Sequence, residues 1–358
     1  MKKKLVGMLA TATLLTMALA GNVQAAEIRS VGPDGEAAVD ASTIELTDEQ
    51  LEQVKEGGYT AAICLHYGGN DWSTSQQKGL EDTFGELGIE IVAVTDANFS
   101  AETQVSNIET VMAKKPDILV SIPTDATATA DAYKQAAAAG IKIVFMDQRA
   151  NGLEAGKDYV SVVSADNYGN GYASGTVLGD ALGGKGKVAM VYYDANFAPT
   201  NQRDEGFRDA MKNYPDIEIV TEQGFTDESG CAEQGDAILT QFPNIDGIYA
   251  SWDVPMEGVL SAVRAAGMEG KVTLACNDLG NNVAREIASG NIAGGGAQMP
   301  YDQGVAEAKL AALALLGEET PSYVAVPAET VTHENVLEAY TDVYHVETPD
   351  WLKEAYVD

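Results

Sequence analysis

Short apolar runs alternate with longer amphipathic stretches along most of the chain. The short runs are rich in Val, Ile, Leu and Ala, which is typical of strands buried on both faces of a parallel sheet. They predict ten strands, at 59–65, 89–94, 117–122, 141–146, 159–163, 186–193, 216–220, 246–250, 271–275 and 292–298. The stretches between them have helical spacing and predict helices at 73–87, 101–114, 126–139, 167–182, 200–213, 229–241, 254–266 and 281–289.

Glycines support this alternation, because four of them stand where a predicted helix ends before the next strand. They are Gly88, Gly140, Gly267 and Gly290. Glycine adopts the left-handed conformation that closes a helix without steric penalty. The pattern predicts a doubly wound α/β protein. Ten strands are more than one such sheet usually holds, and 358 residues suffice for two domains, so we expect two parallel-sheet lobes.

The first 25 residues have the pattern of a secretory signal peptide. Three lysines at 2–4 precede an apolar run at 5–20, and small residues up to Ala25 suit a cleavage site. The run contains three threonines and is short of the roughly 20 strongly apolar residues of a membrane span. Asn22 stands where a lipoprotein would carry its lipidated Cys. We therefore expect a soluble, exported, periplasmic protein that does not insert into the membrane after cleavage.

The composition is that of a folded but very acidic protein. Hydrophobic residues make up 45%, and 22 Lys and Arg stand against 54 Asp and Glu, for a net charge of -32. Removal of the three lysines at 2–4 leaves 19 basic residues against 54 acidic ones, or -35. Such a charge argues against binding to nucleic acid or to an anionic membrane, because neutralising phosphate requires Lys and Arg.

Cysteine and histidine provide no obvious reactive or metal centre. The three cysteines are odd in number and form no CxxC pair, so we favour buried free thiols and leave a bridge between Cys231 and Cys276 open. The three histidines are far apart and have no metal-ligand spacing. We therefore expect no metal and no cofactor.

Polar and aromatic side chains follow the carboxyl ends of the predicted strands, where ligands of such sheets bind. Short Asp, Asn and Gln side chains suit the adjacent hydroxyls of a polyol, and aromatic faces suit the C–H face of a sugar ring. The candidates are His66, Tyr67, Asn70, Asp71, Trp72, Thr124, Asp125, Asp147, Gln148, Arg149, Tyr193, Asp194, Asn196, Trp252, Asp253, Asn277, Asp278 and Gln298.

No motif for catalysis stands out beside them. Residues 179–185 read G-x-x-x-x-G-K, but Gly186 follows where a phosphate-binding loop needs Ser or Thr. The glycines at 169–175 miss the dinucleotide-binding spacing. Asp147 and Asp278 could in principle serve glycoside hydrolysis, but Asp at a strand end is more often a hydrogen-bond acceptor. We therefore expect a binding protein and not an enzyme.

An ordered series of short motifs resembles one family across residues 58–345. The motifs are Gly79, Leu87-Gly88, 116–120, 123–125, Met146-Asp147, 165–167, Gly171, Arg203, 205–207, Asp253, Asn277-Asp278, Gln298, Pro300 and Gln303-Gly304. Together they resemble the periplasmic sugar-binding proteins of ABC importers, the ribose- and galactose-binding branch of the type I fold.

This resemblance implies two lobes joined by a hinge of several crossings. The first crossing would lie at Asp166-Asn167 and the second at 299–301. The implied divisions are a signal peptide at 1–25, an extension at 26–57, an N-lobe at 58–165 plus 299–326, a C-lobe at 166–298 plus 327–345, and a tail at 346–358. Within the extension, Thr47 with Gln50 predicts the capped start of a short helix.

The resemblance also assigns ligand contacts. They fall on Asn70, Trp72, Asp147, Asp278 and Gln298, with one carboxylate from each lobe and Trp72 as a stacking residue. The arginine that contacts ligand in the family aligns with Asn201, and Arg203 is expected behind the site. His66 is equally compatible with a cleft role and a structural one, and we include Asn277 and keep Asp253 as a further candidate.

Departures from the family pattern bear on the ligand. Ile122 and Trp252 stand where ribose binders have Asn, and Gln148 stands where they have Arg. Two polar contacts thus become apolar or aromatic, which points away from ribose and towards a sugar alcohol, a deoxy or methylated sugar, or another small polyol held between Trp72 and Trp252.

The implied function is capture of this ligand by hinge closure and delivery to an ABC permease, by a protein that we expect to be a monomer. A ligand-regulated transcription factor shares the fold but would need a helix-turn-helix and a basic surface. A signalling protein that presents an autoinducer-like or sugar ligand to a receptor stays open, and a secreted glycoside hydrolase is a third possibility.

Overall fold

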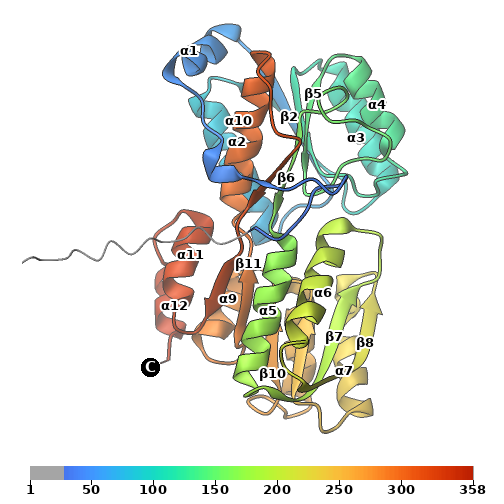
Figure 1. Ribbon diagram of the computed structural model, residues 1–358, viewed down its shortest axis with the longest axis vertical. Coiled ribbons are helices and arrows are strands. Elements are labelled where there is room, and N and C mark those ends of the chain that lie inside the picture. The colour runs from blue at the N-terminus through green and yellow to red at the C-terminus, as the bar shows by residue number, and fades with distance from the viewer. Residues whose placement is uncertain (1–27, 358) are drawn as a thin grey trace, which may run out of the picture.

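The computed structural model describes residues 28–357, which form two lobes stacked along the long axis of the molecule (Figure 1). The predicted signal peptide lies outside these residues. The N-lobe is built on a seven-stranded sheet in the order β1-β12-β6-β5-β4-β2-β3, and all its pairings are parallel. Its strands are β1 (Val39–Asp40), β2 (Thr60–Leu65), β3 (Glu90–Asp96), β4 (Ile118–Ser121), β5 (Lys142–Met146), β6 (Ser161–Ala165) and β12 (Tyr323–Val326).

Helices cover both faces of the N-lobe sheet. On one face lie α1 (Asp48–Gly57), α2 (Asp71–Glu86) and α10 (Pro300–Leu315), and on the other lie α3 (Ala101–Ala113) and α4 (Ala130–Ala138). Leu80 and Phe84 of α2 pack with the alanine-rich face of α10. The close approach of α2 and α10 depends on Gly79, where an added Cβ would lie 2.2 Å from the carbonyl oxygen of Tyr301.

The C-lobe has a six-stranded sheet in the order β13-β11-β10-β9-β7-β8. Only β13 runs antiparallel to its neighbour among the described strands. The strands are β7 (Lys185–Tyr193), β8 (Asp216–Phe225), β9 (Gly247–Ala250), β10 (Thr273–Cys276), β11 (Gly294–Ala297) and β13 (Glu329–Thr332).

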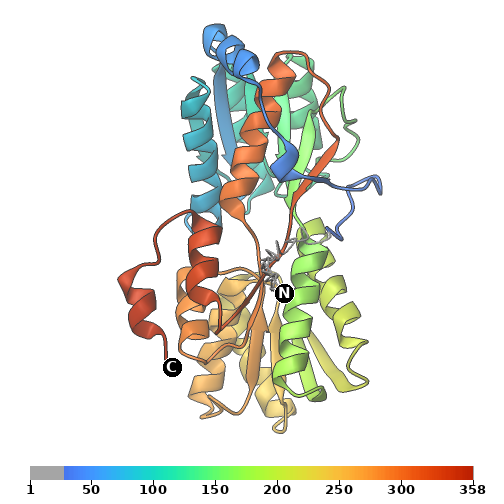
Figure 2. The same ribbon diagram turned by 60° about the vertical axis from the view of Figure 1, so that its left-hand side comes forward.

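The C-lobe sheet is likewise covered on both faces. Helices α5 (Asn167–Ala181) and α6 (Ala198–Met211) lie on one face, and α7 (Cys231–Gln241), α8 (Asp253–Ala265), α9 (Asn281–Ala288), α11 (Val336–Tyr344) and α12 (Asp350–Ala355) lie on the other. Figure 2 shows the last two helices, coloured red, at the side of the lower lobe. The short 3-10 helices are η1 (Ala41–Thr43) and η2 (Glu228–Gly230).

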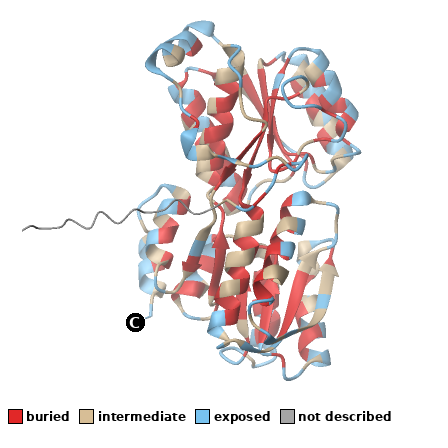
Figure 3. Ribbon diagram, in the orientation of Figure 1, coloured by how far each residue is buried: buried red, intermediate tan, exposed pale blue. Residues whose placement is uncertain are grey.

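The two-lobed α/β fold predicted from the sequence is confirmed. Both sheets are buried between helices (Figure 3), as their continuous apolar runs predict. All four predicted glycine caps have positive φ, from 66° to 86°. Thr47 and Gln50 form the predicted capping box. The prediction did not include β1, β12, β13 and α10 to α12.

From residue 41 to residue 357 the chain crosses between the lobes three times. It passes from β6 to α5 at Asp166, from β11 to α10 at Gln298-Met299, and from β12 to β13 at 327–328. These crossings lie side by side at the waist of the molecule (Figure 1). This arrangement is suited to a hinge, because a few residues per crossing can absorb a rotation of one lobe against the other.

Cys64, Cys231 and Cys276 are all buried and free, so Cys231 and Cys276 form no bridge. Within the described range, none of the helices combines the length and the apolar character that crossing a bilayer requires.

Candidate functional site

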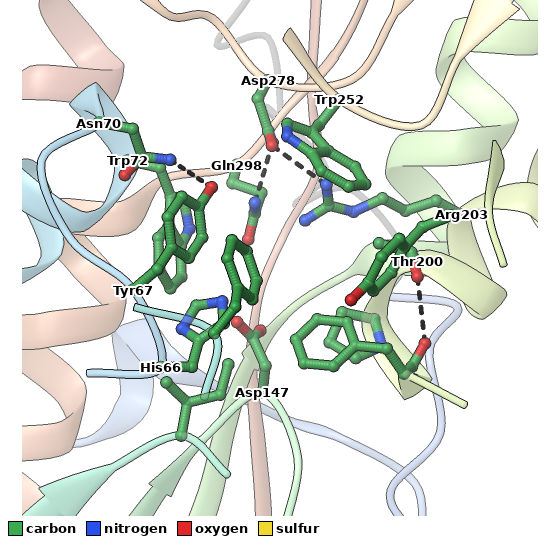
Figure 4. A pocket seen from close by; sticks show the side chains of 15 residues that line it. His66, Tyr67, Asn70, Trp72, Asp147, Thr200, Arg203, Trp252, Asp278 and Gln298 are labelled. Carbon is green, nitrogen blue, oxygen red and sulfur yellow. Dashed lines mark hydrogen bonds and ion pairs between the residues drawn. The ribbon is translucent and has the colours of Figure 1, made fainter. Parts of the chain in front are cut away.

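A cleft lies between the two lobes. Its lining residues come from loops at the carboxyl ends of strands in both sheets, from the start of α2, from the first turns of α6, and from the hinge. They are His66, Tyr67, Asn70, Trp72, Phe99, Ile122, Asp147, Tyr193, Phe197, Pro199, Thr200, Arg203, Trp252, Asp278 and Gln298. Figure 4 shows Gln298 between Asp278 and Asp147, with the N-lobe residues on one side and the C-lobe residues on the other.

Asp147 and Asp278 occupy corresponding positions in the two lobes. Asp147 directly follows β5, and Asp278 follows β10 with one residue between. Both have left-handed backbone conformations, with φ of 53° and 69°. The amide of Asp147 donates to the Val163 carbonyl at 2.7 Å, and that of Asp278 donates to the Gly296 carbonyl at 2.9 Å. Each backbone is thus held by a neighbouring strand, which fixes a carboxylate at the cleft.

A buried arginine balances the charge of the C-lobe carboxylate. Arg203 Nη1 lies 3.0 Å from Asp278 Oδ2, and Gln298 Nε2 donates to Asp278 Oδ1 at 2.9 Å. Arg203 Nε also donates to Asn167 Oδ1 at 2.8 Å. Burial disfavours the charge of Arg203, but Asp278 and Asp147 outweigh burial and raise its pKa. The guanidinium therefore stays charged and ties α6 to the hinge.

Asp147 is less well compensated. Its Oδ1 accepts from Ser164 Oγ at 2.9 Å and from Gln303 Nε2 at 3.4 Å. Burial raises the pKa of Asp147, and the charge of Arg203 opposes that rise. A carboxylate has about four acceptor positions, so Asp147 retains capacity for further donors. Hydroxyl groups of a bound molecule could fill it.

Aromatic rings form most of the remaining walls. Tyr67 stacks on Phe99 with 4.1 Å between ring centroids, and Tyr193 meets Trp252 edge to face at 5.6 Å. His66 of the N-lobe stacks on Phe197 of the C-lobe at 5.7 Å. Such faces provide apolar contact area for the C–H groups of a small molecule.

Three buried polar atoms among the lining residues have no hydrogen-bond partner within residues 28–357. They are Trp72 Nε1, His66 Nδ1 and Gln298 Oε1. Burial lowers the pKa of His66 to about 3, so its imidazole is neutral at physiological pH. Buried polar groups normally find a partner, and a ligand in the cleft is a natural source of one.

The lobes touch at two further points around the cleft. Asp71 at the start of α2 accepts from the backbone and side-chain amides of Asn281 in the C-lobe, at 2.7 and 2.8 Å. The side chain of Gln148 accepts from the amide of Ala198 at 3.2 Å. With the stacking of His66 on Phe197, these contacts define a closed arrangement of the lobes.

Comparison with known proteins agrees with this geometry. Residues 61–319 match the periplasmic binding protein domain, over more than half of the chain. The chain belongs to the periplasmic binding protein family.

Relatives of this periplasmic binding protein include named sugar binders. The D-ribose/D-allose-binding protein of Pseudomonas aeruginosa is 29% identical over 273 residues, which cover 73% of this chain and 83% of the relative. The ribose import binding protein of Salmonella typhimurium is 24% identical over 272 residues, or 76% and 90% of the two chains.

Two solved structures are similar over nearly their whole length. A solute binding protein of an ABC transporter from Actinobacillus succinogenes, with bound D-allose, is 29% identical with a TM-score of 0.72, over 78% of this chain and 99% of its own. One from Agrobacterium vitis, bound with α-D-tagatopyranose, is 25% identical with a TM-score of 0.74, over 82% and 100%.

In this periplasmic binding protein, Tyr67 and Tyr193 from the wider set of candidates line the cleft, and so do seven of the eleven residues predicted to contact the ligand. The seven are His66, Asn70, Trp72, Asp147, Trp252, Asp278 and Gln298. The amide group of Asn70 is already engaged, since it accepts from the Ser73 backbone as the cap of α2 and donates to the Tyr67 hydroxyl. Trp252 presents its ring to the cleft and donates its Nε1 to Glu228 at 3.3 Å.

The other four predicted residues do not line the cleft. Asn201 is exposed on α6, because Thr200 and Arg203, one turn apart, take the inward face of that helix. Gln148 is held by the Pro123 carbonyl at 2.8 Å and bridges the lobes. Asn277 is fully buried and donates to Tyr249 and Ser251. Asp253 starts α8 and accepts from the amide of Val254.

Arg203 lines the cleft although the sequence placed it outside the cleft lining. The sequence comparison placed it behind the site, but it lines the cleft and contacts Asp278 directly. Sequence reasoning also missed Phe99, Phe197, Pro199 and Thr200. Phe197 and Pro199 could have been suspected, because they open the helix that follows Tyr193, whereas Phe99 follows an edge strand and had no comparable signal.

Proposed function

We propose that this protein is an exported solute-binding protein that captures a small sugar or polyol between its lobes and delivers it to an ABC import permease. The observation that carries the proposal is the pair Asp147 and Asp278, one from each lobe, facing one cleft with aromatic walls. Relatives named for ribose and allose support it. A ligand that contacts both carboxylates stabilises the closed form, because open lobes cannot make both sets of contacts.

The same site is proposed to bind without catalysis. Of the two carboxylates that line the cleft, Asp278 is paired with Arg203 and accepts from Gln298, which is the role of a hydrogen-bond acceptor. Burial keeps His66 neutral and its ring stacks on Phe197 across the cleft, and among residues 28–357 no hydroxyl nucleophile bonds to it. The proposal therefore predicts that any captured sugar is recovered unchanged.

A thermal-shift screen tests the binding function. The mature protein is screened against pentoses, hexoses, sugar alcohols and cyclitols, since a ligand that binds the folded state raises the unfolding temperature. At 100 times its dissociation constant, a ligand stabilises by about 2.7 kcal/mol. We expect at least one sugar or polyol to raise the midpoint by several degrees; if none does, the proposal is wrong.

Delivery and export are tested separately. A strain that lacks the gene should lose uptake of the sugar identified in the screen, and a copy with Asp278→Asn should not restore it. Restoration by that variant would count against import through this cleft. N-terminal sequencing of protein recovered from the periplasm should show cleavage after residue 25, and size-exclusion chromatography should show a monomer.

A further inference from the structure

The free hydrogen-bonding capacity of the cleft is concentrated in one part of its lining. Asp147, Asp278, Gln298 and Arg203 supply it at the hinge, and Figure 4 shows the first three in the centre of the cleft. Gln298 Oε1 is buried without a partner within the described chain, and both carboxylates can accept further donors. This part suits several adjacent hydroxyl groups.

Elsewhere in the lining two polar atoms have no partner within residues 28–357, His66 Nδ1 and Trp72 Nε1, and several others are engaged by the protein itself. The Thr200 hydroxyl donates to the Phe197 carbonyl at 3.2 Å, and the Asn70 amide serves Tyr67 and Ser73. Trp252 Nε1 donates to Glu228, which is not among the residues that line the cleft. A hydroxyl directed at this part would therefore meet His66 Nδ1 or Trp72 Nε1 on the N-lobe side, and carbon surface over most of the rest.

What remains there is carbon surface. Ile122 and Pro199 contribute aliphatic groups, and Tyr67, Phe99 and Phe197 contribute rings. Ile122 is only 1% exposed and lies directly after β4, so it is part of the floor of the cleft. A hydroxyl buried against such groups loses its water without gaining a hydrogen bond.

Resting on the proposed function, the geometry points to a narrower ligand class: a monosaccharide with one hydroxylated edge and one apolar edge, that is, a deoxy or methyl-bearing sugar. The hydroxylated edge bonds to Asp147, Asp278 and Gln298, and the apolar edge packs on Ile122 and the ring faces. A fully hydroxylated sugar of the same configuration places one hydroxyl on the apolar side and binds more weakly.

Matched sugar pairs test this by isothermal titration calorimetry. The pairs are L-fucose with L-galactose, L-rhamnose with L-mannose, and 2-deoxy-D-ribose with D-ribose. In at least one pair we expect the deoxy member to bind at least 10-fold tighter, the scale on which an apolar pocket rejects an added hydroxyl. Ile122→Asn offers a hydrogen-bond partner to the extra hydroxyl of the hydroxylated sugar, so it should reduce the ratio of the two dissociation constants. Ile122→Leu, which keeps the volume and the apolar character, should leave that ratio unchanged.

The outcomes separate the two proposals. Equal or tighter binding of the hydroxylated member in every pair overturns the inference about the apolar edge and leaves sugar binding intact. Binding of none of the six sugars, together with no response in the wider thermal-shift screen, overturns both. If Ile122→Asn leaves the ratio of dissociation constants within each sugar pair unchanged, Ile122 does not contact the apolar edge of the ligand, and the position assigned to that edge is wrong.

A second inference concerns the segment 28–40, which runs across the hinge (Figure 1). At one end, Tyr168 of α5 donates its amide to Ser30 Oγ at 3.0 Å, and the guanidinium of Arg29 lies 4.1 Å from the ring centroid of Tyr172. Both partners belong to the C-lobe. Ser30 also donates its amide and its hydroxyl to Asp166, each at 2.8 Å, at the first crossing.

The other end of the segment is fixed to the N-lobe. Asp34 pairs with Arg149 at 2.6 Å, and β1 extends the sheet by pairing with β12. The solved structure with bound D-allose is matched over 99% of its own length but covers 78% of this chain, and the family match begins at residue 61. The segment thus lies outside the region shared with that family match.

We infer that residues 28–40 act as a strap that favours the closed arrangement. Opening moves α5 away from the N-lobe sheet, and the strap is attached to both. Either its contacts to Tyr168 and Tyr172 break or the lobes stay together. The strap therefore shifts the equilibrium between open and closed forms before any ligand binds.

Hydrogen exchange of the ligand-free protein tests the strap. The amides of Ala198 and Asn281 bond across the cleft and are protected only when the lobes are closed. In the double variant Arg29→Ala, Ser30→Ala we expect these two amides to exchange at least 3-fold faster and the radius of gyration by small-angle scattering to rise. Glu56→Ala, on the exposed side of α1, is the matched control.

Two results would overturn the inference about the strap. One is an exchange rate at both amides equal to that of the wild type. The other is an equal acceleration at the core amides of β10, because that would show general destabilisation of the protein.

Discussion

Asp71 of the N-lobe caps the first turn of helix α9 in the C-lobe through Asn281. Its two carboxylate oxygens accept from the backbone amide and the side-chain amide of Asn281 at 2.7 and 2.8 Å. Asn281 is held in turn by the Tyr340 hydroxyl at 2.5 Å. A negative charge at the start of a helix is favourable, so this contact stabilises closure without touching the ligand.

Loss of this contact should weaken ligand retention. In Asp71→Ala both hydrogen bonds between Asp71 and Asn281 disappear. We expect the closed form to lose about 1–2 kcal/mol of stabilisation, which corresponds to a release of the bound sugar that is roughly 5- to 30-fold faster. Stopped-flow release of a sugar found in the screen measures it, and Asp131→Ala, an exposed carboxylate of α4, is the control. A release rate equal to that of the wild type would contradict the assigned contact.

The two cleft carboxylates should differ in their effect on stability. In Asp278→Asn the buried Arg203 loses its ion-pair partner, and we expect the free energy of unfolding to fall by about 3 kcal/mol. Asn tolerates the left-handed backbone at this position, so the effect is electrostatic. In Asp147→Asn a carboxylate whose pKa is raised by burial is replaced by a neutral amide, and stability should change little.

Both changes should nevertheless weaken sugar binding by 10-fold or more. Urea unfolding and calorimetry, carried out on the same two variants, separate the effects. Equal stability loss in both variants would show that Arg203 depends on Asp147 as much as on Asp278.

Two glycines of α2 should respond oppositely to alanine. A Cβ on Gly79 would lie 2.2 Å from the Tyr301 carbonyl oxygen, so Gly79→Ala forces α2 and α10 apart and should destabilise by about 1–3 kcal/mol. A Cβ on Gly85 meets no atom within 4 Å, so Gly85→Ala should stabilise by up to about 1 kcal/mol. Urea unfolding measures both, and destabilisation by Gly85→Ala would contradict the open space described around it.

Stability should depend on pH through Asp204. Burial raises its pKa from 3.8 to about 6, although Ser251 donates to it at 2.7 Å. Between these values the folded protein holds a proton that the unfolded chain has released, so this group makes stability fall as pH rises from about 4 to 6. Above pH 6 its unfavourable contribution is constant, at about 3 kcal/mol.

Asp204→Asn removes this titration while keeping an oxygen acceptor for Ser251. Relative to the wild type, the variant should gain stability between pH 4 and 6 and hold that gain up to pH 8. Unfolding midpoints recorded at each pH provide the measurement. A difference between variant and wild type that does not change with pH would exclude Asp204 as the titrating group.

The elements that the sequence predicts well are those with long continuous apolar runs, such as β5 and β7, because such a run has one stable solution between two layers of helices. The strands it misses are short, and two of them are held by partners far away in sequence. Strand β1 has two residues and depends on β12, and β13 depends on β11. Local pattern carries no information about such pairings.

The site shows the same division. Residues at strand ends, such as Asp147 and Asp278, are predictable because the topology brings all carboxyl ends together. Residues on α6 are not, because which side faces inward depends on packing against α5. There the carbonyl oxygen of Arg203 would lie 1.8 Å from a Cβ on Gly171, so the rotation of α6 is set by that close approach. This is why Arg203, and not Asn201, reaches the cleft.

The matching backbone positions of Asp147 and Asp278 make the site a composite of two half-sites. Each half is fixed within its own lobe by a hydrogen bond to a neighbouring strand, at Val163 or Gly296. Substitutions in one lobe can therefore alter recognition of one edge of the ligand while the other edge is still held in place. Ligand preference can diverge by changing one half at a time, with no intermediate that has lost both anchors.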